Sequence, residues 1–136
     1  MKHMRFPFIL LTLSITVIIT GCKKLEYPNE ETKKVIGQWR YVSSTNTVTG
    51  ASLTSLNNSN WIEFKSDGFY RLFENDTQLE KSKFRFEERK SIAGGERMMI
   101  IYHTGSSRVH SFDLVGDTLH LLDEYYDGFS FKYVKK

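Results

Sequence analysis

Three histidines, His103, His110 and His120, fall on three consecutive predicted strands and could together bind a metal. Neighbouring side chains of a strand point to opposite faces, and the expected register puts His103 and His110 on the apolar face while His120 points away. Asp123 is the candidate third ligand. Zinc usually needs three or four convergent ligands. We therefore expect no metal and no cofactor, and histidines that form ordinary hydrogen bonds or line the mouth of a cavity.

The residue types of acid–base and nucleophilic catalysis are present, but their spacing does not suit catalysis. No serine lies in a strand-to-helix elbow, no glycine-rich loop suits a phosphate, and Gly94-Gly95 fits a hairpin turn. The pairs Glu87-Glu88 and Asp123-Glu124 are sequence neighbours, so on a strand their carboxylates point to opposite faces and cannot act on one bond. We expect that the chain is not an enzyme.

The one cysteine, Cys22, ends a segment with the order of a secretory signal. Lys2 and Arg5 precede an apolar run from Phe6 to Ile19, and small residues follow just before the cysteine. A basic start, a short apolar middle and small residues at the cleavage site are typical of signal peptides. A single cysteine also excludes a disulfide within the chain.

The run Ile19-Thr20-Gly21-Cys22 resembles the bacterial lipobox. The resemblance implies that cleavage leaves Cys22 as the new N-terminus, with a diacylglycerol on its thiol and a third acyl chain on its amine. Two or three chains give a stable anchor, whereas one holds a protein only marginally at about 0.8 kcal/mol per CH₂. Two other interpretations stay open, namely an uncleaved transmembrane helix, for which the run is short of the roughly 20 residues required, and ordinary cleavage that leaves a free thiol.

This interpretation divides the chain into a signal peptide at 1–21, a lipidated cysteine and tether at 22–34, and a β-barrel domain at 35–136. Removing residues 1–21 from the 136-residue chain leaves 115 residues and lowers the formal charge from +3 to about +1. Basic residues are scattered, so we expect no nucleic-acid partner. We expect a monomer held to the membrane through Cys22. Because an aspartate after the cysteine resembles an inner-membrane retention signal and Lys23 stands there instead, we expect the outer membrane, on its periplasmic or surface face.

After Gly37, apolar residues recur at every second position in runs separated by turn residues, which predicts half-buried strands. Short connections predict antiparallel neighbours, and closure would remove both unpaired edges. The sequence therefore predicts an all-β, eight-stranded, antiparallel up-and-down barrel. The predicted strands are 38–43, 61–65, 69–74, 81–88, 97–104, 108–115, 118–124 and 129–135.

The connections predict the register of these strands. Three-residue loops at 66–68 and 126–128, and two-residue turns at 105–106 and 116–117, bring the apolar residues to one face. Residues placed on that face by these turns are Ile62, Phe64, Tyr70, Leu72, Met99, Ile101, Phe112, Leu114, Leu119, Leu121, Phe131 and Tyr133. The long connection from Ser44 to Asn60 predicts a lid over the barrel mouth, with a surface loop as the alternative. Asn29 to Gly37 carries the signals of a short capped helical turn.

Four motifs follow one another in the order typical of lipocalins and of the lipocalin-like domains of bacterial lipoproteins. The run from Val35 to Ser43 resembles their Gly-x-Trp start, and Ile62 to Tyr70 resembles their Phe-x-x-Asp-Gly-x-Tyr hairpin. Gly116 to Leu121 resembles their Gly-Asp-x-Leu-x-Leu strand, and Phe131 to Tyr133 their closing strand. The similarity covers about 35–134.

The resemblance implies that Gly37 and Trp39 close one end of the barrel, with a basic side chain from a late strand over the indole. Lys132 is the nearest candidate, and the usual arginine is missing. We expect the interior to bind a small apolar or amphipathic ligand. The candidate ligand-binding residues are Tyr70, Leu72, Phe84, Phe86, Ile101, His103, His110, Phe112, Leu121 and Tyr133.

The alternative is a solid barrel whose outer face, including Trp61, Phe69 and Phe73, contacts an envelope protein or a glycan. A void above ~300 Å³ would favour ligand binding, and a filled core with an exposed aromatic patch would favour the interaction role.

Overall fold

A computed structural model describes residues 24–55, 59–104 and 108–136. The predicted signal peptide and Cys22 therefore lie outside the described residues. No helix in the described part of the chain is long and apolar enough to cross a membrane. The elements are α1 (Glu30–Val35), β1 (Gly37–Asn46), β2 (Ser52–Thr54), β3 (Asn60–Phe64), β4 (Phe69–Glu74), β5 (Thr77–Lys90), β6 (Glu96–His103), β7 (Val109–Val115), β8 (Thr118–Asp123) and β9 (Phe129–Lys135).

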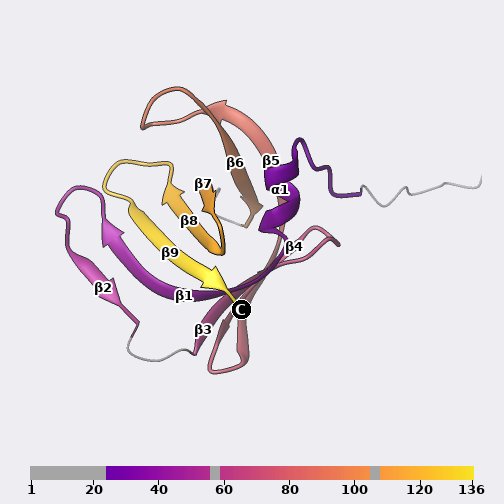
Figure 1. Cartoon of the computed structure of the whole chain (residues 1–136), viewed down its shortest axis with the longest axis horizontal. Coiled ribbons are helices and arrows are strands. Elements are labelled where there is room, and N and C mark those ends of the chain that lie inside the picture. The colour runs from indigo at the N-terminus through magenta and orange to yellow at the C-terminus, as the bar shows by residue number, and fades with distance from the viewer. Residues whose placement is uncertain (1–23, 56–58, 105–107) are drawn as a thin grey trace, which may run out of the picture.

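Eight of these strands form a closed antiparallel barrel, which confirms the predicted fold class. The strands from β3 to β9 pair in chain order, and β1 pairs with both β3 and β9, so the sheet returns on itself. Figure 1 shows the strands curving around a common centre. The short β2 pairs with the far half of β1 and stands outside the eight-stranded closure.

The short helix α1 packs against the end of the barrel that contains Trp39, which we call the closed end. Asn29 caps it by accepting a hydrogen bond from the Thr32 N–H at 2.9 Å, as its sequence signals predict. The Trp39 indole N–H donates to the carbonyl of Val35 at 2.7 Å, and both side chains are fully buried. Leu25 joins the same core, so part of the segment expected to act as a tether belongs to the folded unit.

The basic side chain over the Trp39 indole is Lys135, and the expectation of Lys132 is wrong. The Lys135 ammonium lies 4.3 Å from the ring centroid and donates to the Ile36 carbonyl at 3.1 Å. Lys132 pairs with His120 on the opposite face of the sheet. Gly37 makes the close approach possible, because its φ is 140° and a Cβ there would lie 2.8 Å from the Lys135 nitrogen.

Most of the predicted register is confirmed. Ile62 and Phe64 pair with Leu72 and Tyr70, and Gly68 has the expected left-handed φ of 81°. The turn at 116–117 has two residues, as predicted, since Val115 pairs with Thr118. Between β8 and β9 the predicted shared face is correct, but the connection is longer than expected. Asp123 and Phe129 are the strand ends, so five residues connect the two strands, and Leu121 faces Phe131.

The register between β6 and β7 corrects the prediction by one residue. Ile101 pairs with Val109 and Ile100 with His110, whereas a two-residue turn at 105–106 would pair Ile101 with His110. A one-residue slip exchanges the two faces of a strand. Ile100 and Tyr102 therefore join the core, while Met99, Ile101 and His103 point to the other face. This arrangement puts an aromatic ring inside and the polar imidazole of His103 outside, where it contacts Arg85 at 3.0 Å.

The connection from Ser44 to Asn60 is not a lid in its described residues. β1 continues to Asn46 and turns back into β2, whose three residues are all exposed, and Leu53 is 68% exposed. The turn is tied to the rim of the barrel because the Thr47 N–H donates to the Gly128 carbonyl at 3.0 Å. Residues 56–58 lie outside the described part of the chain.

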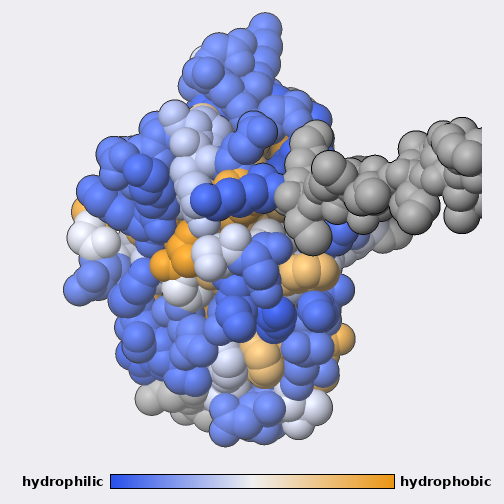
Figure 2. All heavy atoms as spheres, turned by 90° about the vertical axis from the view of Figure 1, so that its right-hand side faces the viewer, coloured by the Kyte–Doolittle hydropathy of each residue, from blue (hydrophilic) through white to orange (hydrophobic). Residues whose placement is uncertain are grey.

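The outer surface is mainly polar. The face in Figure 2 is largely hydrophilic, with small hydrophobic spots separated by polar side chains. The expectation that Trp61 is exposed is wrong: it is only 9% exposed, stacks on Phe73 at 3.7 Å between centroids, and is covered by the Lys136 ammonium at 3.8 Å. Phe69 is half-buried beneath Lys81.

The described helix and strands lie between Glu30 and Lys135 and their core between Leu25 and Tyr133, so a chain of residues 24–136 contains the folded unit that the structure describes. We predict that Leu119→Ala lowers the free energy of unfolding by about 2–5 kcal/mol, because Leu119 is completely buried in the core. The matched variant Leu79→Ala should change it by no more than about 0.5 kcal/mol, because Leu79 is 58% exposed. Urea denaturation measures both, and equal losses would contradict the assignment of the core.

Candidate functional site

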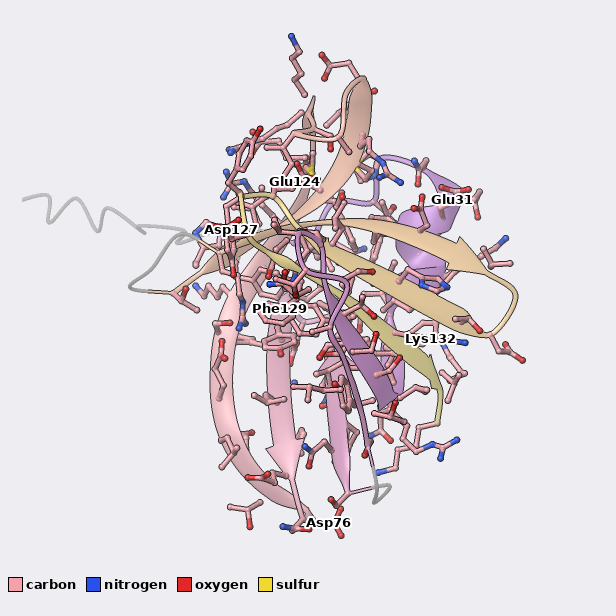
Figure 3. All side chains as sticks on the ribbon, turned by 90° about the vertical axis from the view of Figure 1, so that its left-hand side faces the viewer. Glu31, Asp76, Glu124, Asp127, Phe129 and Lys132 are labelled. Atoms are coloured by element: carbon pink, nitrogen blue, oxygen red, sulfur yellow. The ribbon has the colours of Figure 1, made fainter. Side chains whose placement is uncertain are left out.

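A cavity of about 420 Å³ opens at the end of the barrel opposite Trp39, which we call the mouth. Its walls come from the middle of β1, the first residues of β3, β4 and the start of β7, the last residues of β8, and β9, together with the connection after β8. Figure 3 shows Glu124, Asp127 and Phe129 together around that connection. The lining residues are Tyr41, Asn60, Trp61, Ile62, Tyr70, Leu72, Arg108, His110, Leu121, Asp123, Tyr125, Phe129, Phe131 and Tyr133.

The structure brings five of the ten predicted ligand-binding residues to this cavity, namely Tyr70, Leu72, His110, Leu121 and Tyr133. Three others, Phe84, Phe86 and Phe112, are buried in the core below it, where their rings pack against one another. Ile101 and His103 do not face the interior, because of the one-residue shift between β6 and β7. The barrel is therefore filled at its closed end and hollow at its mouth.

A chain of buried polar groups crosses the inner wall of the mouth. His110 Nδ1 lies 3.0 Å from the Tyr102 hydroxyl, and His110 Nε2 lies 2.8 Å from Asp123 Oδ1. A neutral imidazole with its proton on Nε2 fits both contacts, since it donates to the carboxylate and accepts from the phenol. All three side chains are less than 10% exposed. The chain fixes the orientation of His110 on the cavity wall.

Asp123 also holds the connection that follows it. Its second oxygen accepts from the Phe129 N–H at 2.9 Å. Burial would raise the pKa of the Asp123 carboxyl, but hydrogen bonds from His110, from the Phe129 N–H and from Tyr125 together hold that pKa below its ordinary value. Gly128 permits this arrangement, because a Cβ there would lie 2.5 Å from the Asp123 Cβ.

Arg108 is a residue of the mouth that sequence reasoning missed. Its guanidinium lies 4.5 Å from the ring centroid of Tyr102 and 5.2 Å from that of Tyr70, and its Nη2 donates to Glu80 at 2.9 Å. Its Nε is buried and has no hydrogen-bond partner among the described residues. Arg108 lies two positions before His110, so strand alternation would have placed it on the same face.

The tyrosine hydroxyls at the mouth stay protonated over the whole neutral range. Burial raises the pKa of Tyr70 to about 12, with Arg108 opposing the rise and Glu80 adding to it. Burial likewise raises the pKa of Tyr102 and of Tyr133, and the neighbouring Tyr70 adds to both. These phenols are therefore hydrogen-bond donors at neutral pH.

The three residues considered as candidate metal ligands, His103, His110 and Asp123, do not converge in the structure. His110 and Asp123 meet at the mouth, while His103 lies on the outer face beside Arg85. No group of three or more His, Cys, Asp or Glu side chains within 24–55, 59–104 and 108–136 is arranged to hold a metal ion. The mouth of the barrel thus combines an apolar wall with a wall of polar and charged side chains.

Comparison with known proteins gives no relative: no family model, no curated protein and no solved structure matches the chain. The function is therefore argued from the cavity itself.

We predict that Asp123→Asn lowers the free energy of unfolding by about 1–3 kcal/mol at neutral pH, because a buried carboxylate with several donors is lost. The native pKa lies below the unfolded value of about 3.9, so the stabilisation is complete above that pH and disappears as the pH falls through the native pKa. Urea denaturation of the wild type and of Asp123→Asn at a series of pH values should show that the difference between their free energies of unfolding becomes smaller toward acid pH. An Asp117→Asn control, at an exposed turn, should run parallel to the wild type, and a constant gap for Asp123→Asn would contradict the assignment.

Proposed function

We propose that this chain is a lipid-anchored, lipocalin-like protein of the bacterial cell envelope that binds a small apolar or amphipathic molecule in the mouth of its barrel without chemically changing it. The observation that carries the proposal is the cavity of about 420 Å³, which lies above the ~300 Å³ at which typical ligand pockets begin. Ligand sites in proteins are typically concave and mostly apolar, with a few polar groups that orient the ligand. The mouth has this composition.

The two walls of the cavity have different chemistry, and this supports an amphipathic ligand. Leu72, Leu121 and Phe131 offer an apolar surface. Arg108 and the Tyr70 hydroxyl offer hydrogen bonds on the other side. An alkyl or aromatic group can bury against the first wall while a polar end meets the second.

The position of the N-terminal segment agrees with a membrane anchor. Leu25 packs in the core together with Trp39, and Tyr27 lies near Phe86 with ring centroids 6.4 Å apart. Cys22 stands three residues before Leu25, so the acyl chains would attach near the closed end, away from the cavity. An anchor there leaves the mouth unobstructed.

A protein- or glycan-interaction module is the second candidate. It is favoured by apolar residues exposed at the rim of the mouth, where Tyr126 is 89% exposed and Val48 63% exposed. The burial of Trp61 removes one of the aromatic residues on which that interpretation relied.

We predict that the natural protein, purified from the organism that encodes it, carries a stoichiometric small molecule in native mass spectrometry that is lost on unfolding. Leu72→Trp should abolish this extra mass by filling the cavity, while Leu79→Trp, on an exposed side chain of the neighbouring strand, should retain it. Calorimetric titration of residues 24–136 with octan-1-ol checks the same site without the natural ligand. A bare protein that also binds neither octan-1-ol nor its charged analogues octanoate and octylammonium would contradict ligand binding and favour the interaction module.

We predict that the mature protein begins at Cys22 with two or three acyl chains and sediments with membranes. Cys22→Ser should remove the acyl mass and block maturation, because the thiol that would accept the diacylglycerol is gone. Intact-mass measurement and membrane fractionation check both. A mature wild-type protein with an unmodified cysteine would contradict the anchor and leave the cavity proposal standing.

A further inference from the structure

The polar wall of the mouth carries a cationic guanidinium, that of Arg108, beside the hydroxyl groups of Tyr70 and Tyr133. Arg108 Nε is buried without a partner among the described residues, although the same guanidinium is bonded to Glu80 through Nη2. A buried donor left unpaired costs about 1–3 kcal/mol, and more on a charged group. The Tyr70 hydroxyl adjoins the guanidinium and stays protonated, as does that of Tyr133.

The carboxylates of the mouth are already occupied by donors from the protein. Asp123 accepts from His110 and from the Phe129 N–H, and Tyr125 adds a third hydrogen bond. Glu80 accepts from Arg108 and also from the Ser82 hydroxyl at 3.4 Å. Asp123, the carboxylate that lines the cavity, therefore has both of its oxygens engaged by donors of the protein.

From these observations we infer that the ligand is an anionic amphiphile, with a carboxylate-type head group that pairs with the Arg108 guanidinium, whose side chain is 31% exposed at the mouth, and that accepts a hydrogen bond from the neighbouring tyrosine hydroxyl. This inference rests on the proposed ligand-binding function and specifies its ligand class. A charged acceptor on a guanidinium is roughly twice as strong as a neutral pair. The stacking of Arg108 on Tyr102 and Tyr70 holds the guanidinium plane in place, so little freedom is lost when the anion arrives.

The tail of this amphiphile would lie along the apolar wall. Leu72 and Ile62 form a cross-strand pair there, and Leu121 pairs with Phe131 across the cavity's other side. A cavity of about 420 Å³ suits a medium-length alkyl chain or a small ring system rather than a two-chain lipid. Glu80 acts as a competitor of the ligand, because it shares the same guanidinium.

The test compares three probes with one alkyl tail and different head groups, namely octanoate, octan-1-ol and octylammonium. Each is titrated calorimetrically at neutral pH into the folded unit of residues 24–136. We expect octanoate to bind at least about tenfold more tightly than octan-1-ol, which is the range of one charge-assisted hydrogen bond, and octylammonium to bind most weakly. The order of the wild-type affinities for these three probes tests the charge of the head group without any variant.

Two variants assign the preference to Arg108. Arg108→Gln should bring the octanoate-to-octanol ratio close to one, and Glu80→Gln should raise the ratio severalfold by removing the competing carboxylate. Circular dichroism confirms that each variant is folded. Each variant is judged by the ratio of its affinities for octanoate and octan-1-ol. A variant that merely loosens the mouth weakens the binding of both probes and leaves this ratio unchanged.

The outcomes separate this inference from the function on which it rests. Octan-1-ol binding as tight as octanoate, tightest binding of octylammonium, or an unchanged ratio in Arg108→Gln would overturn the anionic head group and leave the cavity function intact. Failure of all three probes to bind would overturn the ligand-binding function itself.

Discussion

The pairing of β1 with β9 is the constraint on which the rest of the structure depends. β1 has ten residues and pairs with β9 from Trp39 to Asn46, but with β3 only from Gly37 to Arg40. Beyond Arg40 the strand leaves β3 and takes β2 as its neighbour. The barrel is therefore closed all round at one end, while at the other the wall separates between Tyr41 and Asn60, both of which line the cavity. One long strand with two successive partners produces both a sealed floor and an open mouth.

The distribution of side-chain types along the barrel axis follows from this geometry. At the closed end no water is available, so apolar groups such as Val35, Phe64 and Leu119 fill the space, and the one polar atom of Trp39 bonds to a backbone carbonyl. At the mouth the inward positions carry tyrosine, histidine, aspartate and arginine. These side chains have polar ends that must find partners, and their mutual hydrogen bonds hold them against the walls instead of letting them collapse into the centre. The hollow half of the barrel is thus maintained by a polar network.

The alternation of apolar residues predicted the number, order and pairing of the barrel strands, because a two-residue period and short turns leave few other arrangements. It failed between β6 and β7, where turn residues around Gly105 fit either of two registers and the local pattern Met99-Ile100-Ile101-Tyr102 is apolar on both faces. Because this pattern does not alternate, the face that points inward is selected by the packing of Tyr102 against Phe64, Tyr70 and Arg108. Arg108 was missed for a different reason: alternation places it on the same face as His110, but a charged side chain is not expected inside a barrel unless its stacking partners are known. The cavity volume could not be predicted, because the alternation of side chains along a strand tells which of them point inward and nothing about how completely they fill the space.

The proposed anchor and the proposed ligand site place opposite demands on the two ends of the barrel. Leu25 packs in the core cluster that contains Trp39, and two residues separate it from Cys22, a span of at most about 10 Å. An acylated Cys22 would hold the closed end close to the lipid surface and direct the mouth toward the aqueous phase. A ligand would then have to cross water to reach Arg108, which suits an anionic amphiphile with a short tail because such a molecule is soluble as a monomer. A long-chain lipid taken directly from the bilayer would instead require the mouth to face the membrane, and the position of Leu25 argues against that arrangement.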